Sequence, residues 1–226
     1  AGNTALTVST AAELAWVAET VNDRTTTGSG SETGFEGCTI TLSSDIDLND
    51  QDWTTINGFK GIFDGNKHII KGLKVPQERG NGGLFGYVNG GTIKNLSVII
   101  SNEGIKGQYA GGIAGKAEGT TTITNCCVLG GPINARHTGD NYGTTTISYC
   151  SVAVSSITAT LVEKYAEASA GGIVGNQQSS PLSIQNCLSF TTNITATATE
   201  NDAEKSLAGI LGGGSGTLSG NYSNPL

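Results

Sequence analysis

The sequence has little charge, few aromatic residues and no long apolar run. Of its 226 residues, 14% are charged and 6% are aromatic, there are 4 prolines, and methionine is absent. Because no apolar run is long enough to cross a bilayer as a helix, no transmembrane segment is expected. The net charge of −7 disfavours nucleic acid and anionic membranes as partners. The chain has no initiator methionine and no signal peptide, which is typical of a processed, mature secreted protein.

We expect the 5 cysteines to be buried thiols and not to form disulfides. Their odd number leaves at least one thiol free, and three of them occupy the same place in a repeat: Cys126, Cys150 and Cys187. Stacked positions lie about 4.8 Å apart, but parallel Cα–Cβ directions disfavour a disulfide there. We therefore expect small buried apolar side chains. No metal site is expected, because neither a Cys-x-x-Cys pair nor a suitably placed histidine accompanies the cysteines.

Glycine is abundant, with 34 residues, and much of it stands in a repeated phrase. Four copies of a Gly-Gly-apolar-x-Gly phrase begin at Gly82, Gly111, Gly171 and Ala208. A second phrase of the Ile-x-Asn-Cys type follows each copy, beginning at Ile93, Ile123, Ile184 and Leu218, and an orphan copy begins at Ile147. Repeats of this length predict a stacked, quasi-one-dimensional fold. With a third strand after the second phrase, about three short strands form each coil, which describes a parallel β-helix.

The chain before the repeats predicts a helix, a loop and the first coils. Thr10 and Glu13 make a capping box that predicts an amphipathic helix over 9–22. Its apolar residues recur at helical spacing: Leu14, Val17, Ala18 and Val21. Such a helix is a standard cover for the open first coil of a solenoid. Residues 23–37 are polar and Gly/Ser-rich and predict a flexible loop, and 38–80 supply the first coils. We therefore expect a single domain over 1–226, with the repeats over 81–226.

An asparagine precedes the cysteine in the second phrase, and we expect it to lie where the coil bends. Asparagine tolerates the left-handed backbone conformation, and its amide can hydrogen-bond to the neighbouring coil. In the orphan copy Tyr149 replaces this asparagine. The replacement predicts an irregular coil between residues 129 and 146.

Residues 82–96 read Gly-Gly-Leu-Phe-Gly-Tyr-Val and then, after Asn89, Gly-Gly-Thr-Ile-Lys-Asn-Leu. This stretch resembles the GLUG motif, and residues 10–22 and 44–73 are similar to blocks familiar from exported proteins of gut Bacteroidetes. The resemblance implies an all-β, right-handed parallel β-helix in an extracytoplasmic location, secreted or attached to the cell surface, and it implies no activity. Some immunoglobulin-A peptidases carry GLUG repeats beside a zinc-protease domain. The His-Glu-x-x-His of that domain is absent here, where the histidines are His68 and His137.

The best candidate for chemistry is a row of four aspartates on one short stretch: Asp45, Asp47, Asp50 and Asp52. Period-two alternation points Ile46 and Leu48 inward and the carboxylates beside them outward. Such a row could hold Ca²⁺, or serve as the acid and base of a β-helical polysaccharide enzyme. The row is not an EF-hand, because an aspartate stands where that loop needs glycine. A lyase would also need a nearby basic residue; Lys60 and Lys67 lie close in sequence, but nothing pairs them with the carboxylates. Solvated strand and turn aspartates are the simpler explanation.

Two equivalent acidic connections, 161–169 and 199–206, are the second candidate for binding. They should protrude side by side, and variable loops on one side of a solenoid are a common place for a ligand. Their candidate binding residues are Tyr165, Glu167, Glu200 and Asp202. His68 is expected to be exposed or structurally hydrogen-bonded, because no Ser, Cys or carboxylate is spaced to partner it. Trp53 is expected to pack under the first coil.

These observations favour a non-enzymatic extracellular or cell-surface module for adhesion or for binding a glycan or a surface protein. No catalytic residue and no cofactor is assigned, and Ca²⁺ is the one ion that the acidic row would suit. Two alternatives stay open. The first is a carbohydrate-active enzyme, a polysaccharide lyase or glycoside hydrolase, that uses the acidic row over 45–52. The second is a structural stalk.

Overall fold

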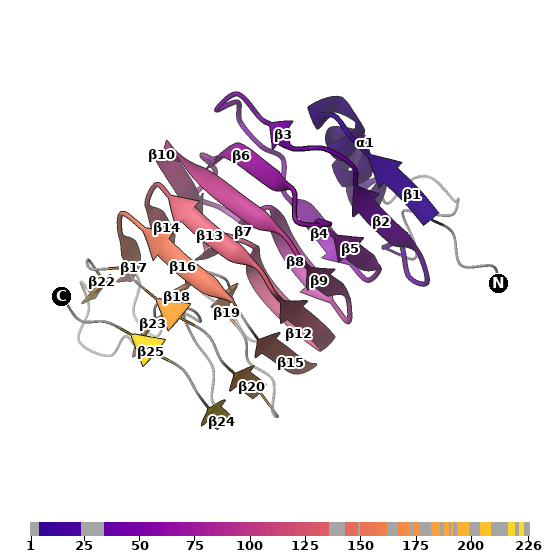
Figure 1. Ribbon diagram of the computed structural model, residues 1–226. Helices are drawn as coiled ribbons and strands as arrows, with labels where there is room; N and C mark the ends of the chain where they lie inside the picture. Colours follow the sequence, from indigo (N-terminus) through magenta and orange to yellow (C-terminus); the bar gives the residue numbers. More distant parts are fainter. Residues whose placement is uncertain are drawn as a thin grey trace.

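The chain folds mostly into β-strands that lie in parallel sheets, with helix α1 near the N-terminus (Figure 1). The computed structural model describes residues 5–23, 34–135, 143–148 and 150–161. It also describes shorter pieces farther along: 167–171, 174–176, 182–185, 188–189, 191, 194–198, 204–208, 217–219 and 222–223. Every strand pairing given among these residues is parallel, so the all-β expectation is confirmed.

The first sheet carries the second phrase of each repeat. Its order is β1 (Ala5–Val8), β2 (Thr39–Leu42), β5 (Ile62–Asp64), β9 (Thr92–Lys94), β12 (Ala114–Thr124), β15 (Gly143–Ser148), β20 (Leu182–Gln185) and β24 (Thr217–Ser219). Strands β4 (Ile56–Phe59), β8 (Phe85–Asn89) and β19 (Val174–Asn176) join it through β8 and β12. Ile93 and Ile123 are in register, and Ile147 continues the same row. The orphan copy therefore stacks in line with the complete ones.

The second sheet carries the strands that follow the bend. Its order is β22 (Ile194–Ala198), β17 (Ile157–Leu161), β14 (Ile133–Ala135), β10 (Ser97–Gly107), β13 (Cys127–Gly130), β16 (Ser151–Val154), β21 (Leu188–Ser189) and β25 (Tyr222–Ser223). Strands β3 (Ile46–Asp47) and β6 (Ile69–Val75) extend it next to β10. Ile157 pairs with Ile194, so the last two predicted third strands lie side by side, as the repeat alignment requires.

The third sheet is short and carries the start of the glycine phrase. It consists of β23 (Glu204–Ala208), β18 (Glu167–Gly171), β11 (Tyr109–Gly111) and β7 (Asn81–Gly82). Gly111, Gly171 and Ala208, the first residues of three copies of the phrase, are in register. The repeat read from the sequence is therefore the structural repeat of the stack.

Close backbone approach between neighbouring repeats explains why the phrase needs glycine. A Cβ at Gly82 would overlap the carbonyl oxygen of Lys106. A Cβ at Gly115 would lie 2.9 Å from the amide nitrogen of Gly82, closer than carbon and nitrogen can pack. Neither glycine has a positive φ, so the requirement is space and not conformational freedom.

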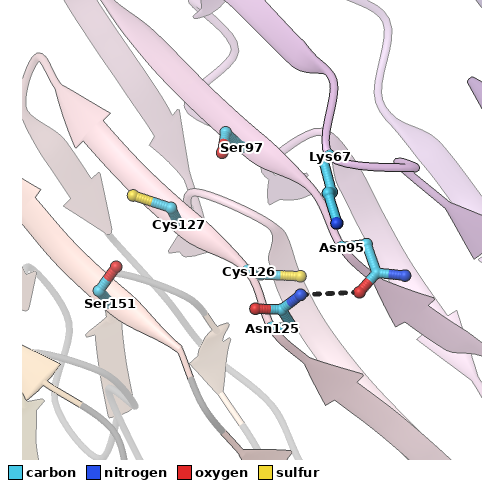
Figure 2. Close-up of a pocket in the computed structure, with 7 residues that line it drawn as sticks. All are labelled: Lys67, Asn95, Ser97, Asn125, Cys126, Cys127 and Ser151. Carbon is cyan, nitrogen blue, oxygen red and sulfur yellow. Dashed lines mark hydrogen bonds between the residues drawn. The ribbon is translucent and has the colours of Figure 1, made fainter.

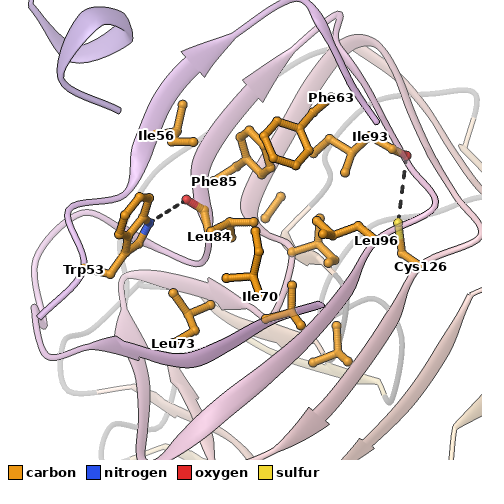
Figure 3. Packing of buried hydrophobic residues seen from close by; sticks show 14 of the residues in the cluster. Trp53, Ile56, Phe63, Ile70, Leu73, Leu84, Phe85, Ile93, Leu96 and Cys126 are labelled. Atoms are coloured by element: carbon orange, nitrogen blue, oxygen red, sulfur yellow. Dashed lines mark hydrogen bonds between the residues drawn. The ribbon is translucent and has the colours of Figure 1, made fainter. Parts of the chain in front are cut away.

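The core lies between the sheets and is apolar (Figure 3). Phe59, Phe63 and Phe85 are fully buried, with ring centroids 5.1 to 6.4 Å apart. Burial of one such side chain contributes about 1.5–3 kcal/mol. Trp53 is also buried, and its indole N–H donates to the Leu84 carbonyl at 3.0 Å, so its predicted packing is confirmed.

Helix α1 (Ala11–Asn22) confirms the predicted helix and its cap. The Glu13 amide donates to the Thr10 hydroxyl at 3.2 Å, and the Thr10 amide donates to the Glu13 carboxylate at 3.1 Å. The apolar face predicted for the helix is buried and packs against β4: Leu14, Val17, Ala18 and Val21. None of the described helices is long and apolar enough to cross a membrane.

Most of the predicted flexible loop over 23–37 lies outside the described residues, and the described end of it is packed. Residues 34–37 form a turn in which Phe35 is buried and meets the Trp16 ring edge-on at 6.4 Å. One aromatic residue in this polar stretch therefore packs the turn against the helix, and the flexibility of the rest of the loop stays a prediction.

The predicted bends and buried thiols are confirmed where the structure describes them. Asn95 and Asn125 have φ of 54° and 52°, in the left-handed region. Cys126 and Cys150 are both buried, and each thiol points at a backbone carbonyl. Cys187 lies outside the described residues, as do residues 136–142 of the irregular coil predicted between residues 129 and 146.

Candidate functional site

The acidic row lies at the N-terminal end of the second sheet, and a row of cations on the next strand faces it. Ile46 and Leu48 are buried while Asp45 and Asp47 are exposed, so the predicted alternation is confirmed. Asp47 is in register with Lys71 of β6, and their charged atoms lie 2.9 Å apart. Directly opposed charges on neighbouring strands stabilise a sheet, so this contact has an ordinary structural explanation.

The far end of the row is also paired. Asp52 forms a bridge with Lys74, whose ammonium lies 3.3 Å from the Asp52 carboxylate and 2.7 Å from that of Glu103. Lys74 therefore joins three successive levels of the stack. Asp50 stands apart in a turn with Asn49, where both residues have positive φ. The four aspartates do not converge on a common point.

His68 has a carboxylate partner, which corrects the expectation that none is spaced to reach it. Its Nδ1 lies 3.1 Å from Asp45 Oδ1, which also accepts the Ile69 amide at 3.0 Å. The signal was available in the repeat length. Asp45 precedes Ile69 by 24 residues (69 − 45) and Asp47 precedes Lys71 by 24 residues (71 − 47), one level of the stack. A coil length read from the first strands would have found both pairs.

The neighbours of Asp45 and Asp47 keep these two carboxylates ionised. The Ile69 amide and then His68 lower the pKa of Asp45, and the Lys71 ammonium and then the Asn49 amide lower that of Asp47. Asp47 in turn raises the pKa of Lys71. A general acid needs a carboxyl whose pKa is raised toward neutrality, and neither aspartate has one.

Other candidate residues are not brought to this site. Tyr165, Glu200 and Asp202 lie outside the described residues, and Glu167 begins β18 in the third sheet, opposite Glu204. Within the described part of the chain, no three His, Cys, Asp or Glu side chains gather in a way that could hold a metal ion.

A second polar cluster, which sequence reasoning missed, joins β8 to β12. The Tyr87 hydroxyl donates to Glu118, whose other carboxylate oxygen lies 3.0 Å from Lys116. The Lys116 ammonium also stands over the Tyr87 ring, 4.9 Å from its centroid. Burial and then the neighbouring Glu118 raise the pKa of Tyr87. Glu118 Oε1 is buried and has Lys116 as its ion-pair partner but makes no hydrogen bond. All three side chains contact one another, so the cluster is best explained as a structural contact between neighbouring repeats.

Among the described residues, one feature that could hold a ligand is a recess of about 200 Å³ at the bend between the first and second sheets (Figure 2). We call it the polar recess, and its lining residues are Lys67, Asn95, Ser97, Asn125, Cys126, Cys127 and Ser151. Ser97, Cys127 and Ser151 begin β10, β13 and β16 and are in register, so they form a line of small side chains along the stack. His68 does not line the recess, although it is the next residue after Lys67.

An asparagine ladder crosses the floor of the polar recess. Asn125 Nδ2 donates to Asn95 Oδ1 at 2.7 Å, and Asn95 Nδ2 donates to Asp64 Oδ1 at 2.9 Å. Lys94 lies 3.2 Å from the other oxygen of Asp64. Burial acts to raise the pKa of Asp64, but the hydrogen bonds from Asn95, from the Asn66 amide and from Lys94 together lower it. The sequence predicted the amide contacts between coils and gave no sign that a recess accompanies them.

Comparison with known proteins adds a likeness in fold. No family model matches the chain, and no curated protein matches it. The structure is similar to the crystal structure of a putative immunoglobulin A1 protease from Bacteroides ovatus, with a TM-score of 0.51 and 19% sequence identity. The match covers 82% of this chain and 68% of that chain. At this identity the likeness concerns the fold alone.

Proposed function

We propose that this chain is a right-handed parallel β-helix that serves as a non-enzymatic binding module outside the cytoplasm, with a glycan or a surface protein as its ligand. A general rule of topology supports the right-handed form, since parallel strands joined by crossover connections are right-handed in about 98% of cases. The extracytoplasmic location rests on the resemblance of residues 82–96 to the GLUG motif.

The observation that carries the proposal is the polar recess. It lies on a stack held by continuous parallel pairing, and its lining combines amide, hydroxyl, thiol and ammonium groups. Several of these groups make no hydrogen bond within the described part of the chain, and a ligand could therefore bind them without first breaking a contact. A stalk would need no such recess.

The acidic row gives the enzyme alternative little support. Asp45 and Asp47 each accept a charged or backbone donor and are held ionised, which suits a structural pair and not an acid. The Asp45–His68 pair resembles the supporting half of a catalytic triad. Among the described residues, however, no hydroxyl or thiol bonds to His68. A peptidase function is likewise unsupported, because the sequence lacks His-Glu-x-x-His.

The test is a glycan and polysaccharide array on the purified chain, with and without Ca²⁺, that scores both binding and released product. Binding without product would support the module. Product release that an Asp45→Asn, Asp47→Asn double variant abolishes would refute it and assign an enzyme to the acidic row. A chain that neither binds nor releases product, in this array and in a matching panel of surface proteins, would leave the stalk.

A further inference from the structure

We propose that the polar recess binds an anionic sugar residue, whose carboxylate or sulfate group pairs with Lys67. This inference rests on the proposed binding function and names the ligand class for the same recess. It follows from one unpaired cation, from the backbone that fixes it, and from an asparagine ladder that stops at the recess.

Lys67 is the one charged side chain that lines the recess, and it has no ion-pair partner within the described part of the chain. Four other described lysines are paired with carboxylates at 2.7 to 3.3 Å: Lys71, Lys74, Lys94 and Lys116. Lys60 and Lys106 are unpaired as well but lie outside the recess. An unpaired ammonium carries three donors and no acceptor, so it favours an anionic oxygen as its partner.

The backbone holds Lys67 in a conformation that suits glycine better. Asn66 and Lys67 have φ of 49° and 69°, and the His68 amide donates to the Gly65 carbonyl at 2.8 Å, which closes a turn of type I′. The favoured sequence for such a turn is Asn-Gly. The Lys67 amide donates to the Asn95 carbonyl at 2.8 Å, which ties the turn to the next level of the stack. Figure 2 shows the Lys67 side chain extending toward Asn95 and the floor of the recess.

The asparagine ladder ends at the recess and leaves hydrogen-bonding capacity there. Each amide donates to the level before it, from Asn125 to Asn95 and from Asn95 to Asp64. In the next copy of the phrase, Tyr149 stands at the position of the asparagine, and its side chain has no amide group to continue the series. Within the described residues, Asn125 Oδ1 therefore accepts nothing, and the hydroxyls of Ser97 and Ser151 are also without a side-chain partner. An acceptor and two hydroxyls beside a cation match a sugar that carries both hydroxyls and an acidic group.

The volume of the recess and the net charge of the chain restrict the class of ligand further. About 200 Å³ is the space of roughly six or seven waters at about 30 Å³ each, which suits a single sugar ring. The net charge of −7 makes general attraction of anions unfavourable. An anion that binds this chain must therefore gain its affinity from a local contact, and Lys67 offers it.

The test uses isothermal titration of the full chain with three oligosaccharides that differ only in the terminal residue: glucuronate, glucose, and glucose carrying a sulfate ester. The variants are Lys67→Gln, which removes the charge, Lys67→Arg, which keeps it, and Lys106→Gln, a matched control outside the recess. Sodium acetate and sodium sulfate serve as competitors that lack the sugar.

We expect the glucuronate or sulfate probe to bind the natural chain, with Lys67→Gln on the order of tenfold weaker, equivalent to about 1.4 kcal/mol. Lys67→Arg and Lys106→Gln should stay within about twofold of the natural chain, a small change on that scale. Preference for the glucuronate or for the sulfate probe would identify the source of the charge.

Equal binding of the glucose probe, or no loss in Lys67→Gln, would overturn the inference and leave the binding module standing. Displacement by acetate or sulfate at concentrations equal to the sugar's would mean an anion site and not a sugar site. If no glycan of the wider array binds, the inference falls together with the glycan form of the proposed function.

Discussion

Replacing Asn95 by alanine should destabilise the protein through two effects that can be separated. Asn95 has a φ of 54° and makes side-chain hydrogen bonds at 2.9 Å to Asp64 and at 2.7 Å to Asn125. A left-handed residue with a Cβ costs about 1–2 kcal/mol, which asparagine partly offsets by local hydrogen bonding. Each lost hydrogen bond costs about 0.5–1.5 kcal/mol net. Because asparagine already bears part of that conformational cost, the two lost hydrogen bonds dominate, and we expect Asn95→Ala to lower the free energy of unfolding by about 1–4 kcal/mol.

A glycine variant at the same position separates the energetic effect of the backbone conformation from that of the side-chain hydrogen bonds. Asn95→Gly loses both hydrogen bonds but adopts a positive φ without steric cost. It should be more stable than Asn95→Ala by about 1 kcal/mol, after its own backbone entropy cost is counted. The measurement is urea unfolding followed by circular dichroism, with the m-value checked so that shifts in midpoint report stability.

A double-variant cycle with Asn125→Ala then tests whether the amides act as a ladder. The Asn95–Asn125 bond predicts a coupling energy of at least about 0.5 kcal/mol, as is usual for residues in contact. The reasoning is refuted if Asn95→Ala stays within about 0.5 kcal/mol of the natural chain, the range of ordinary surface changes. It is also refuted if the glycine variant is no better than the alanine variant.

Three further predictions concern the stack. The folded state holds the pKa of Asp64 below its ordinary value of 3.8. The ionised Asp64 carboxylate therefore contributes its full stabilisation above that pH, and the stabilisation is lost as the pH falls through the folded pKa. Urea midpoints measured between pH 5 and pH 2.5 should fall less in Asp64→Asn than in the natural chain. Gly82→Ala should cost about 1–3 kcal/mol, because the added Cβ overlaps the Lys106 carbonyl, and an unchanged thermal midpoint would mean that neighbouring repeats are not in close contact. Trp53→Phe should cost about 0.5–1.5 kcal/mol, because the Leu84 carbonyl loses the indole donor and keeps only the Ile56 amide, and equal urea midpoints for the two proteins would contradict that account.

The repeat made much of this fold predictable from the sequence. Once the Gly-Gly and Ile-x-Asn-Cys phrases are aligned, stacking follows, and the structure places Ile93, Ile123 and Ile147 in one row. The helix and its cap followed from Thr10, Glu13 and a regular apolar spacing. The buried cysteines and left-handed asparagines followed from their positions within the phrase. In each case a local pattern and the stacking constraint point to the same answer.

The site was much less predictable, because its contacts join residues one level apart without a shared motif. The sequence drew attention to the aspartates over 45–52, whereas the structure pairs them with His68, Lys71 and Lys74. Those partners can be found only when the coil length at that end of the stack is known. Lys67 stood out in the sequence only as a lysine near the acidic row, because its positive φ and its lack of an ion-pair partner are seen only in the structure.

The end of the asparagine ladder also determines how many ligands one chain can hold. A perfectly periodic stack presents the same surface at every level, so any site built from it would recur and bind many copies of a ligand weakly and equally. Here Asn125 is the last asparagine of the series, because Tyr149 stands at the equivalent position in the next copy of the repeat. That departure from periodicity makes the level of Asn125 different from the levels before it. A valency of one per chain, measured as the stoichiometry of binding, is what such a defect in a regular array would produce.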